Sequence, residues 1–349
     1  MTWTPTDRDI ARCRLRTQAL VEPYAASADA VVGSLLAVQA ENPAQSAWAV
    51  ACRTATPDAT ELADLLDDGR VVRTHVLRPT WHFVAAADLR WIQAVTADRV
   101  QRLNGTIYRQ QGLGPDVLDR ALKLIMKELT GGVCLTRAEL GRVLATEGLP
   151  LAYLIMNAEL EGVICSGPIR GAQHTYALVS ERVDHSADGD AGELAYRFFA
   201  GHGPASVKDF ARWSSLTLTQ CNQAVEAAAG RLESEIVDGS TLWFDPDGPG
   251  PASSDRAMLL PIYDELTLSY PKINFGRARQ HPHQPGTDRF VGSVIVDKID
   301  VGTWRRTVKG QKLIMELVLA PEVDADQRAA VEAEAARLAG FLGKQLQFG

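Results

Sequence analysis

Apolar residues recur with a helical period in several segments near the start of the chain. This pattern predicts helices over residues 6–21, capped by Thr6, over residues 27–38, from Pro43 onward, and over residues 58–66. Residues 70–84 alternate between apolar and polar positions and are rich in β-branched residues, which predicts two short strands around Arg78-Pro79. Helices followed by a strand pair are the order of a winged helix-turn-helix unit.

The same order of elements recurs twice further along the chain. One repeat has a helix opened by a capping box at Thr136 and Glu139, a second helix over 151–161, and strands at 163–168 and 175–179. The other repeat has helices over 193–200, 207–213 and 219–231, followed by a hairpin over 236–244 that turns at Asp238-Gly239. We therefore expect three helix–helix–hairpin units, related by structure rather than by sequence.

After a Pro/Gly/Ser-rich linker at residues 245–255 the pattern changes to strands. Four segments read as strands, and they are followed by an amphipathic helix: 259–263, 290–296, 301–307, 312–319 and the helix 324–342. These segments predict an α+β fold of three tandem winged helix-turn-helix units followed by a small C-terminal antiparallel β-barrel and a terminal helix. The expected domains are 1–112 (the first unit with a connecting helix), 113–183, 184–250 and 251–349.

The amino-acid composition is typical of a globular protein that does not span a membrane. The 349 residues are 46% hydrophobic and 23% charged, as in soluble globular proteins, and no apolar stretch suits a membrane span. We expect a cytoplasmic protein without a membrane partner. The five cysteines are scattered and form no CxxC pair, which argues against a disulfide framework and a metal site. No phosphate-binding loop, dinucleotide fingerprint or Gly-x-Ser-x-Gly motif occurs, so no cofactor is expected.

The charge is unevenly distributed. The net charge is −7, but residues 272–312 hold nine Lys or Arg against three Asp, which makes this stretch +6 and the remainder −13. A basic module on an acidic chain suits nucleic acid, although a solvated surface can also carry such an excess. Adjacent Arg305 and Arg306 on a strand face opposite ways, so one would reach phosphate while the other stays with the barrel. The candidate contacts to a DNA backbone are Arg170, Lys208, Arg212, Arg277, Arg279, Arg305 and Arg306.

Candidate chemistry lies where the apolar run 30–38 stops. Gln39, Glu41 and Asn42 follow it, and Pro43 suits the first position of another helix. Gln39 and Glu41 are two residues apart in an expected turn, so both side chains can point into the same space. The alternative is purely structural: a helix C-terminus followed by Asn42 as the cap of the next helix.

Five segments, taken in order, resemble a known family. They are Leu35–Glu41, Arg73–His82, Phe199–Ala205, Leu260–Glu265 and Val301–Arg306. With these segments the chain resembles, over nearly its whole length, the AlkZ/YcaQ-type family of winged-helix DNA glycosylases. The resemblance implies three tandem winged-helix units with a C-terminal β-barrel.

The resemblance also assigns roles to residues. The family's catalytic motif is Gln-x-Gln or Gln-x-Asp, at the position of Gln39-Ala40-Glu41 here, and Glu41 departs from both forms by keeping the carboxylate on a side chain one methylene longer than Asp. Glu41 would accept a proton from water and stabilise the sugar cation, while Gln39 would orient water or sugar. The residues expected to support the site or bind substrate are Asn42, Arg78, Thr80 and His82. For His82 a structural role is the alternative.

One further carboxylate pair has to be interpreted. Asp264 and Glu265 are adjacent on an expected strand, where their side chains would diverge, so we assign them to turn or salt-bridge roles rather than to catalysis.

The expected function is therefore a metal-free monofunctional DNA glycosylase. It would hydrolyse the N-glycosidic bond of alkylated purines or bulky adducts in double-stranded DNA, in general repair or in self-resistance. The first alternative is a non-catalytic DNA-binding protein, either a transcription regulator or a lesion-binding resistance protein, and a protein-interaction scaffold is the second. A pure binder has no need of a carboxylate facing DNA. No dimer helix or heptad pattern occurs, which favours a monomer without an obligate protein partner.

Overall fold

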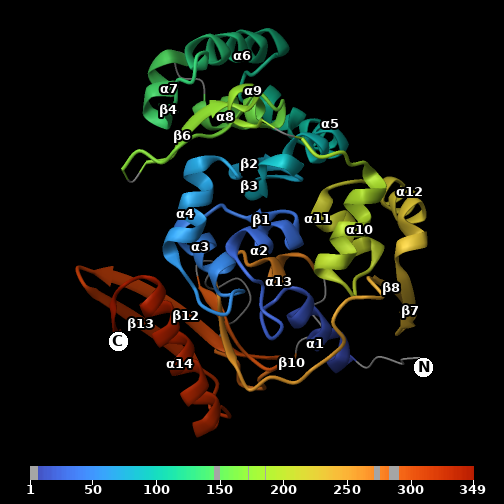
Figure 1. The fold of residues 1–349 in the computed structure, drawn as a ribbon, viewed down its shortest axis with the longest axis vertical. Helices are drawn as coiled ribbons and strands as arrows, with labels where there is room; N and C mark the ends of the chain where they lie inside the picture. Colours follow the sequence, from blue (N-terminus) through green and yellow to red (C-terminus); the bar gives the residue numbers. More distant parts are fainter. Residues whose placement is uncertain (1–6, 145–149, 172, 185, 271–275, 283–290) are drawn as a thin grey trace.

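A first group of elements occupies the centre of the molecule (Figure 1). In this computed structural model the described residues are 7–144, 150–171, 173–184, 186–270, 276–282 and 291–349. The central helices are α1 (Asp7–Thr17), α2 (Ala28–Leu35), α3 (Pro43–Ala51) and α4 (Ala59–Asp68). Beside them, β1 (Val38–Gln39), β3 (Arg78–Ala85) and β2 (Val71–Val76) form an antiparallel sheet in that order. The expected cap Thr6 lies outside the described residues.

Local sequence explains where these helices begin. The hydroxyl of Ser27 accepts the backbone N–H of Ala30 at the start of α2, and the carboxylate of Asp58 accepts that of Thr60 at the start of α4. Pro43 occupies the first turn of α3, where a missing N–H costs nothing, as predicted.

Two boundaries differ from the sequence prediction. The helix α2 ends at Leu35, because Leu36 adopts a left-handed conformation with φ 64°, and Val38 and Gln39 form a strand instead of the last helical turn. The turn between β2 and β3 is made at Leu77, with φ 62°, so Arg78 and Pro79 already belong to β3. In both places a buried leucine takes a conformation that side chains with a Cβ rarely adopt, which sequence patterns do not reveal.

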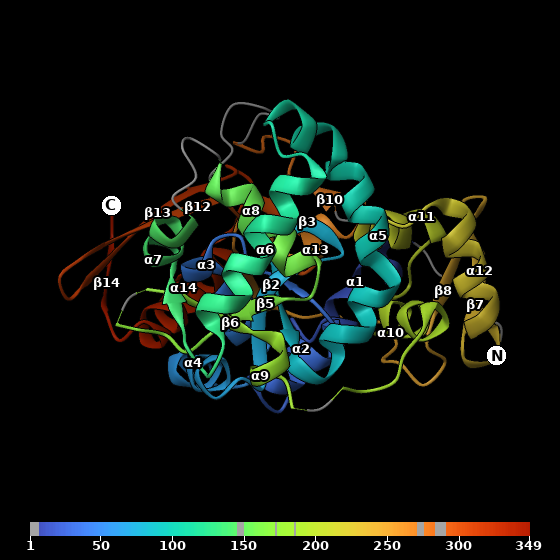
Figure 2. The same cartoon turned by 90° about the horizontal axis from the view of Figure 1, so that it is seen from above.

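The second group covers the central sheet from above (Figures 1 and 2). Its helices are α5 (Ala86–Gln110), α6 (Pro115–Leu129), α7 (Arg137–Leu144), α8 (Leu151–Leu160) and α9 (Val179–Arg182). Its sheet has the order β4 (Leu135–Thr136), β6 (Thr175–Leu178), β5 (Ile164–Ser166). The Thr136–Glu139 capping box forms as predicted. The helices α5 and α8 pack against β2.

The third group lies beside the centre. It consists of α10 (Ala191–His202), α11 (Val207–Ser214), α12 (Leu218–Ala228), a short 3-10 turn (Ala229–Arg231) and the hairpin β7 (Glu233–Val237) with β8 (Ser240–Phe244). The hairpin turns at Asp238-Gly239, as predicted. Capping boxes at Ser206–Asp209 and Thr217–Gln220 define the starts of α11 and α12. The interpretation of the three groups as winged-helix units, with the expected domain bounds, stays a prediction.

The C-terminal part is a sheet flanked by a helix. Its elements are β9 (Ala257–Leu260), α13 (Glu265–Leu268), β10 (Gly276–Arg277), β11 (Gly292–Val296), β12 (Ile299–Lys309), β13 (Lys312–Leu319), α14 (Ala325–Phe341) and β14 (Gln345–Phe348). The strand order is β14-β13-β12-β11-β9, and β10 also pairs with β12. The pairs β10–β12 and β13–β14 are parallel.

The expected small antiparallel barrel is not found. Among the described residues the end strands β9 and β14 do not pair, so the sheet is open, and its strand directions are mixed. The strand expected over 259–263 ends at Leu260, and the turn that follows leads into α13. Asp264 and Glu265 therefore lie at the start of a short helix and not on a strand.

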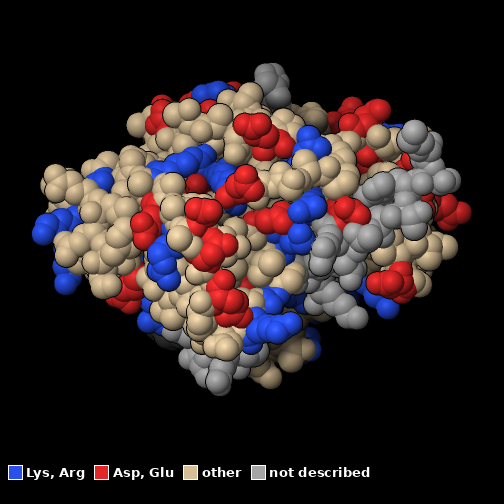
Figure 3. Space-filling model, turned by 90° about the horizontal axis from the view of Figure 1, so that it is seen from below, with Lys and Arg blue, Asp and Glu red and all other residues tan. Residues whose placement is uncertain are grey.

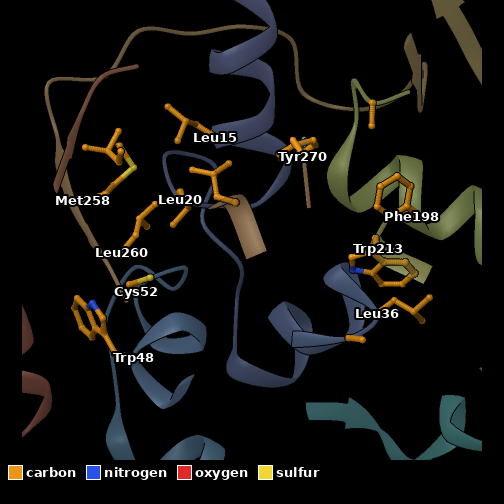
Figure 4. Close-up of a cluster of buried hydrophobic side chains, with 14 of the residues drawn as sticks. Leu15, Leu20, Leu36, Trp48, Cys52, Phe198, Trp213, Met258, Leu260 and Tyr270 are labelled. Carbon is orange, nitrogen blue, oxygen red and sulfur yellow. The ribbon is translucent and has the colours of Figure 1, made fainter. Parts of the chain in front are cut away.

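One buried apolar cluster joins the first and third groups to the C-terminal sheet. Figure 4 shows Leu36 near Trp213 and Phe198, and Trp48 near Cys52. The indole N–H of Trp48 donates to the carbonyl of Leu259 over 2.9 Å, which fixes α3 to β9. A separate buried cluster fills the second group. Residues distant in sequence therefore pack against the elements on both sides of Gln39 and Glu41.

The close approach of α2 and α10 yields a stability prediction. A Cβ added to Gly201 would lie 2.2 Å from the carbonyl oxygen of Ser34, so Gly201→Ala has to push the two backbones apart. We expect a loss of about 1–3 kcal/mol in the free energy of unfolding, measured by chemical denaturation. The control is Gly33→Ala on α2, where a Cβ meets nothing within 4 Å, and helix propensity predicts equal or greater stability. A Gly201→Ala protein as stable as the parent would contradict this packing.

Candidate active site

Gln39 and Glu41 lie in the turn between β1 and α3. The side-chain oxygen Oε1 of Gln39 accepts the backbone N–H of Glu41 over 3.0 Å. This bond fixes the turn and leaves the amide nitrogen Nε2 of Gln39 as the group that can face a ligand, since it donates to no other group in the described part of the chain. Gln39 is 6% exposed, and its backbone pairs with His82 across β1 and β3.

Glu41 is exposed at the surface. Its oxygen Oε2 accepts the backbone N–H of Trp81 over 3.3 Å, and Oε1 has no hydrogen-bond partner among the described residues. The pair therefore forms an open site, with one carboxylate oxygen held and the other free for water.

Asn42 stands at the cap position of α3 but does not cap it. Its side chain makes no capping hydrogen bond and is exposed, whereas its backbone carbonyl accepts the N–H groups of Gln45 and Ser46. The purely structural interpretation explains the start of α3 at Pro43 but not the Asn42 side chain.

His82 is fully buried behind the turn and is fixed in one neutral form. Its Nε2 lies 3.1 Å from Nη2 of Arg78, which can only donate, so Nε2 accepts and Nδ1 donates to the carbonyl of Thr80 over 2.9 Å. Burial, together with the nearby Arg78 cation, lowers the pKa of His82 to about 3. His82 is thus unable to exchange a proton at neutral pH, and the geometry favours its structural role. The Thr80 hydroxyl is buried without a hydrogen-bond partner in the described residues.

Glu265 reaches the back of the site from α13. Its Oε1 accepts the backbone N–H of Gln39 over 2.9 Å and lies 3.6 Å from Nη2 of Arg78. Its Oε2 accepts the hydroxyl of Ser269 over 3.2 Å and lies 3.8 Å from Nε2 of His202. Burial by itself would raise the pKa of Glu265, but His202 and Arg78 outweigh it and lower the pKa to about 2. Glu265 is therefore a buried anion behind Gln39.

The sequence predicted turn or salt-bridge roles for Asp264 and Glu265, but not the contact that Glu265 makes with Gln39. Asp264 has the expected salt bridge, because both of its oxygens accept N–H groups of the buried Arg53, at 2.8 and 2.9 Å. The contact of Glu265 with Gln39 was missed. Two adjacent carboxylates that follow the apolar strand 257–260 indicate buried ion pairs. A local sequence pattern cannot identify a partner more than 200 positions away.

A second set of side chains supports the turn from the other side. Nε of Arg73 donates to the carbonyl of Ala40 over 2.9 Å, and its guanidinium lies 4.4 Å above the Trp81 ring. Glu159 on α8 accepts the indole N–H of Trp81 over 3.3 Å and pairs with Nδ1 of His75. Burial lowers the pKa of Arg73. The second group thus contributes one carboxylate to the support of the site.

The basic residues expected to contact DNA divide into three sets. Arg306 donates to the carbonyl of Ala44 over 2.8 Å, so it faces α3, and burial lowers its pKa. Arg170 binds Glu139 at 3.1 Å within the second group. The remaining five are exposed: Lys208, Arg212, Arg277, Arg279 and Arg305.

Acidic and basic side chains alternate on the one face of the molecule drawn in space-filling form (Figure 3). Of the basic stretch 272–312, residues 272–275 and 283–290 lie outside the described part of the chain. No helix among the described residues has the length and apolar character to cross a membrane. The described residues also contain no group of three or more potential metal ligands.

Comparison with known proteins places this chain in a family. The family described as DNA glycosylase AlkZ-like matches residues 32–341, a span that contains both Gln39–Glu41 and Glu265. The chain belongs to the AlkZ-like family. A curated relative, the interstrand DNA cross-link repair glycosylase of Streptomyces sahachiroi, is 26% identical over 234 residues. That alignment covers 61% of each chain, so the match spans less than two thirds of the relative's length.

A solved structure from the same organism shares the fold. The Streptomyces sahachiroi DNA glycosylase AlkZ superposes with a TM-score of 0.78 and covers 99% of this chain and 100% of its own, at 21% sequence identity. The AlkZ-like fold therefore extends over the whole chain.

The buried His82 generates a pH prediction for this AlkZ-like protein. The unfolded chain binds a proton on His82 near its ordinary pKa of 6.5, whereas the folded protein resists it down to about 3. The contribution of the neutral His82 to the free energy of unfolding is therefore fully present above pH 6.5. It is lost progressively as the pH falls from 6.5 towards about 3. We expect His82→Gln to reduce the slope of unfolding free energy against pH by up to about 1.4 kcal/mol per unit between about pH 6 and about pH 5. Equal slopes in parent and variant would contradict the buried neutral state.

Proposed function

We propose that this protein hydrolyses the N-glycosidic bond of alkylated purines in double-stranded DNA, with Glu41 as the general base. The observation that carries the proposal is the exposed Glu41 carboxylate, held by Trp81 through one oxygen and open at the other. The amide nitrogen of Gln39, whose Oε1 accepts the backbone N–H of Glu41, would orient water or the sugar. Membership of the AlkZ-like family supports the same reaction class.

The groups around the turn suit a substrate that is already cationic. An N3- or N7-alkylated purine carries positive charge, so it leaves without being protonated, and the reaction needs an activated water and nearby negative charge. The carboxylate of Glu41 supplies both. His82, with a pKa of about 3, offers no acid at neutral pH, and Arg73 and Arg78 are poor proton donors. Neutral damaged bases, which need protonation to leave, are therefore expected to be poor substrates.

The openness of the site supports bulky adducts as a second substrate class. Because the Glu41 side chain is exposed at the surface, an adduct beside it does not have to fit inside a closed cavity. The relative from Streptomyces sahachiroi is named as a cross-link repair glycosylase. We extend that substrate class to this chain as part of the proposal.

We propose DNA contact through the three helix-and-sheet groups, interpreted as winged-helix units, and through the exposed basic residues. Arg212 is the most pertinent, because it is exposed on α11 and its Nε donates to the carbonyl of Leu268 on α13, the helix that carries Glu265, over 2.9 Å. A cation so near the site is suited to hold a phosphate flanking the lesion. We further propose that the protein acts as a cytoplasmic monomer, which rests on the sequence pattern alone.

The role of Glu41 gives the test. We expect Glu41→Gln to slow single-turnover release of N7-methylguanine from a duplex by about 100-fold or more, because the amide has the same length but cannot accept the proton. Glu41→Asp restores the Gln-x-Asp form of the motif, and we expect a rate within about tenfold of the parent.

The control is Glu226→Gln, which neutralises an exposed carboxylate on α12. It should leave the rate unchanged. Full activity of Glu41→Gln would refute the base role. Tight binding to the duplex without release by the parent would favour the alternative of a non-catalytic DNA-binding protein.

A further inference from the structure

The segment 261–265 contacts the catalytic turn at several points. The backbone N–H of Ile262 donates to the side chain of Gln45 on α3 over 3.0 Å, and Glu265 accepts the N–H of Gln39 over 2.9 Å. Both contacts join residues more than 200 positions apart in the sequence. The C-terminal part of the chain therefore holds both sides of the turn that carries Gln39 and Glu41.

Three residues with positive φ lie just before the elements that carry the site residues. Leu36, Leu77 and Tyr263 have φ values of 64°, 62° and 65°, in the left-handed region that residues with a Cβ rarely adopt. They precede β1, β3 and α13, which carry Gln39, Arg78 and Glu265. Strain of this kind persists only where the surroundings determine the conformation.

From these contacts we propose that Glu265 is a positioning residue of the site. Its carboxylate fixes the backbone of Gln39 and thereby aims the amide nitrogen of Gln39 at the reacting sugar or water. Glu265 is 1% exposed and touches no substrate, so it acts through Gln39. This inference rests on the proposed glycosylase function and extends it to a residue outside the Gln39–Glu41 motif.

The charge on Glu265 is part of this role. A neutral amide at this position could still accept the N–H of Gln39, but it would not balance Arg78, whose Nη2 also donates to His82. Arg78 would then stand as a buried cation without its anion, a costly arrangement that displaces neighbouring groups. The strand β3, which pairs with β1 at Gln39 and His82, would carry that displacement directly to the turn.

The first measurement tests the contact without relying on catalysis. Amide hydrogen exchange is followed in the peptide that contains Gln39, for the parent and for Glu265→Gln. The matched control is Glu334→Gln, which removes another buried carboxylate, on α14, that pairs with two arginines, Arg256 and Arg337. We expect exchange at Gln39 to accelerate at least about tenfold in Glu265→Gln only. Equal exchange in all three proteins would overturn the proposal.

The second measurement tests positioning through a double-mutant comparison. Single-turnover release of N7-methylguanine is measured at saturating enzyme, below the unfolding temperature of every variant. We expect Glu265→Gln to slow the rate about tenfold without a change in the dissociation constant for DNA, and Glu334→Gln to leave the rate within about twofold. In a Gln39→Ala background, Glu265→Gln should slow the reaction by less than about twofold, because its effect passes through Gln39.

Fully additive effects of the two substitutions would overturn the positioning role. If Glu265→Gln does not fold, Ser269→Ala removes one hydrogen bond to the same carboxylate, and we expect a smaller slowing in the same direction. A Ser269→Ala enzyme with the parent's rate and the parent's exchange at Gln39 would then overturn it. A parent that releases no base but protects Gln39 through Glu265 would refute the proposed function while the contact stands.

Discussion

The buried carboxylate of Glu265 is the interaction on which the candidate site depends. It gathers a backbone N–H of β1, the guanidinium of Arg78 and the hydroxyl of Ser269 around one anion with no access to water. An unpaired charge in this position would cost several kcal/mol. The chain has therefore to bring its C-terminal part against its N-terminal part before the turn at Gln39 and Glu41 takes its final shape.

Burial and hydrogen bonding distinguish Glu265 and His82 from Glu41. Glu265 and His82 are buried and bound, and their pKa values of about 2 and about 3 keep them in single protonation states at neutral pH. Glu41 is the carboxylate that meets solvent. Its buried neighbours hold the geometry of the turn. Such a site suits a reaction whose leaving group departs without an acid.

Local patterns predicted most elements of the fold, because capping residues, turn residues and apolar periodicity act over a few positions. Pro43 at the start of α3, the Asp238-Gly239 hairpin and the capping box at Thr136 are examples. The open mixed sheet and the left-handed Leu36 and Leu77 depend on tertiary packing, and they were not predicted. Within the site, the sequence motif predicted Gln39 and Glu41. The contact of Glu265 with Gln39 joins positions 226 apart, so no local pattern encodes it.

The most direct test of the account measures free base released from two duplexes, one with a single N7-methylguanine and one with a neutral lesion such as hypoxanthine. The parent protein is used without substitution, and release is compared with spontaneous depurination in its absence. We expect release of N7-methylguanine well above the spontaneous rate and little release of hypoxanthine, because the site offers a base and no acid. Equal release of both bases, or of neither, would contradict the account.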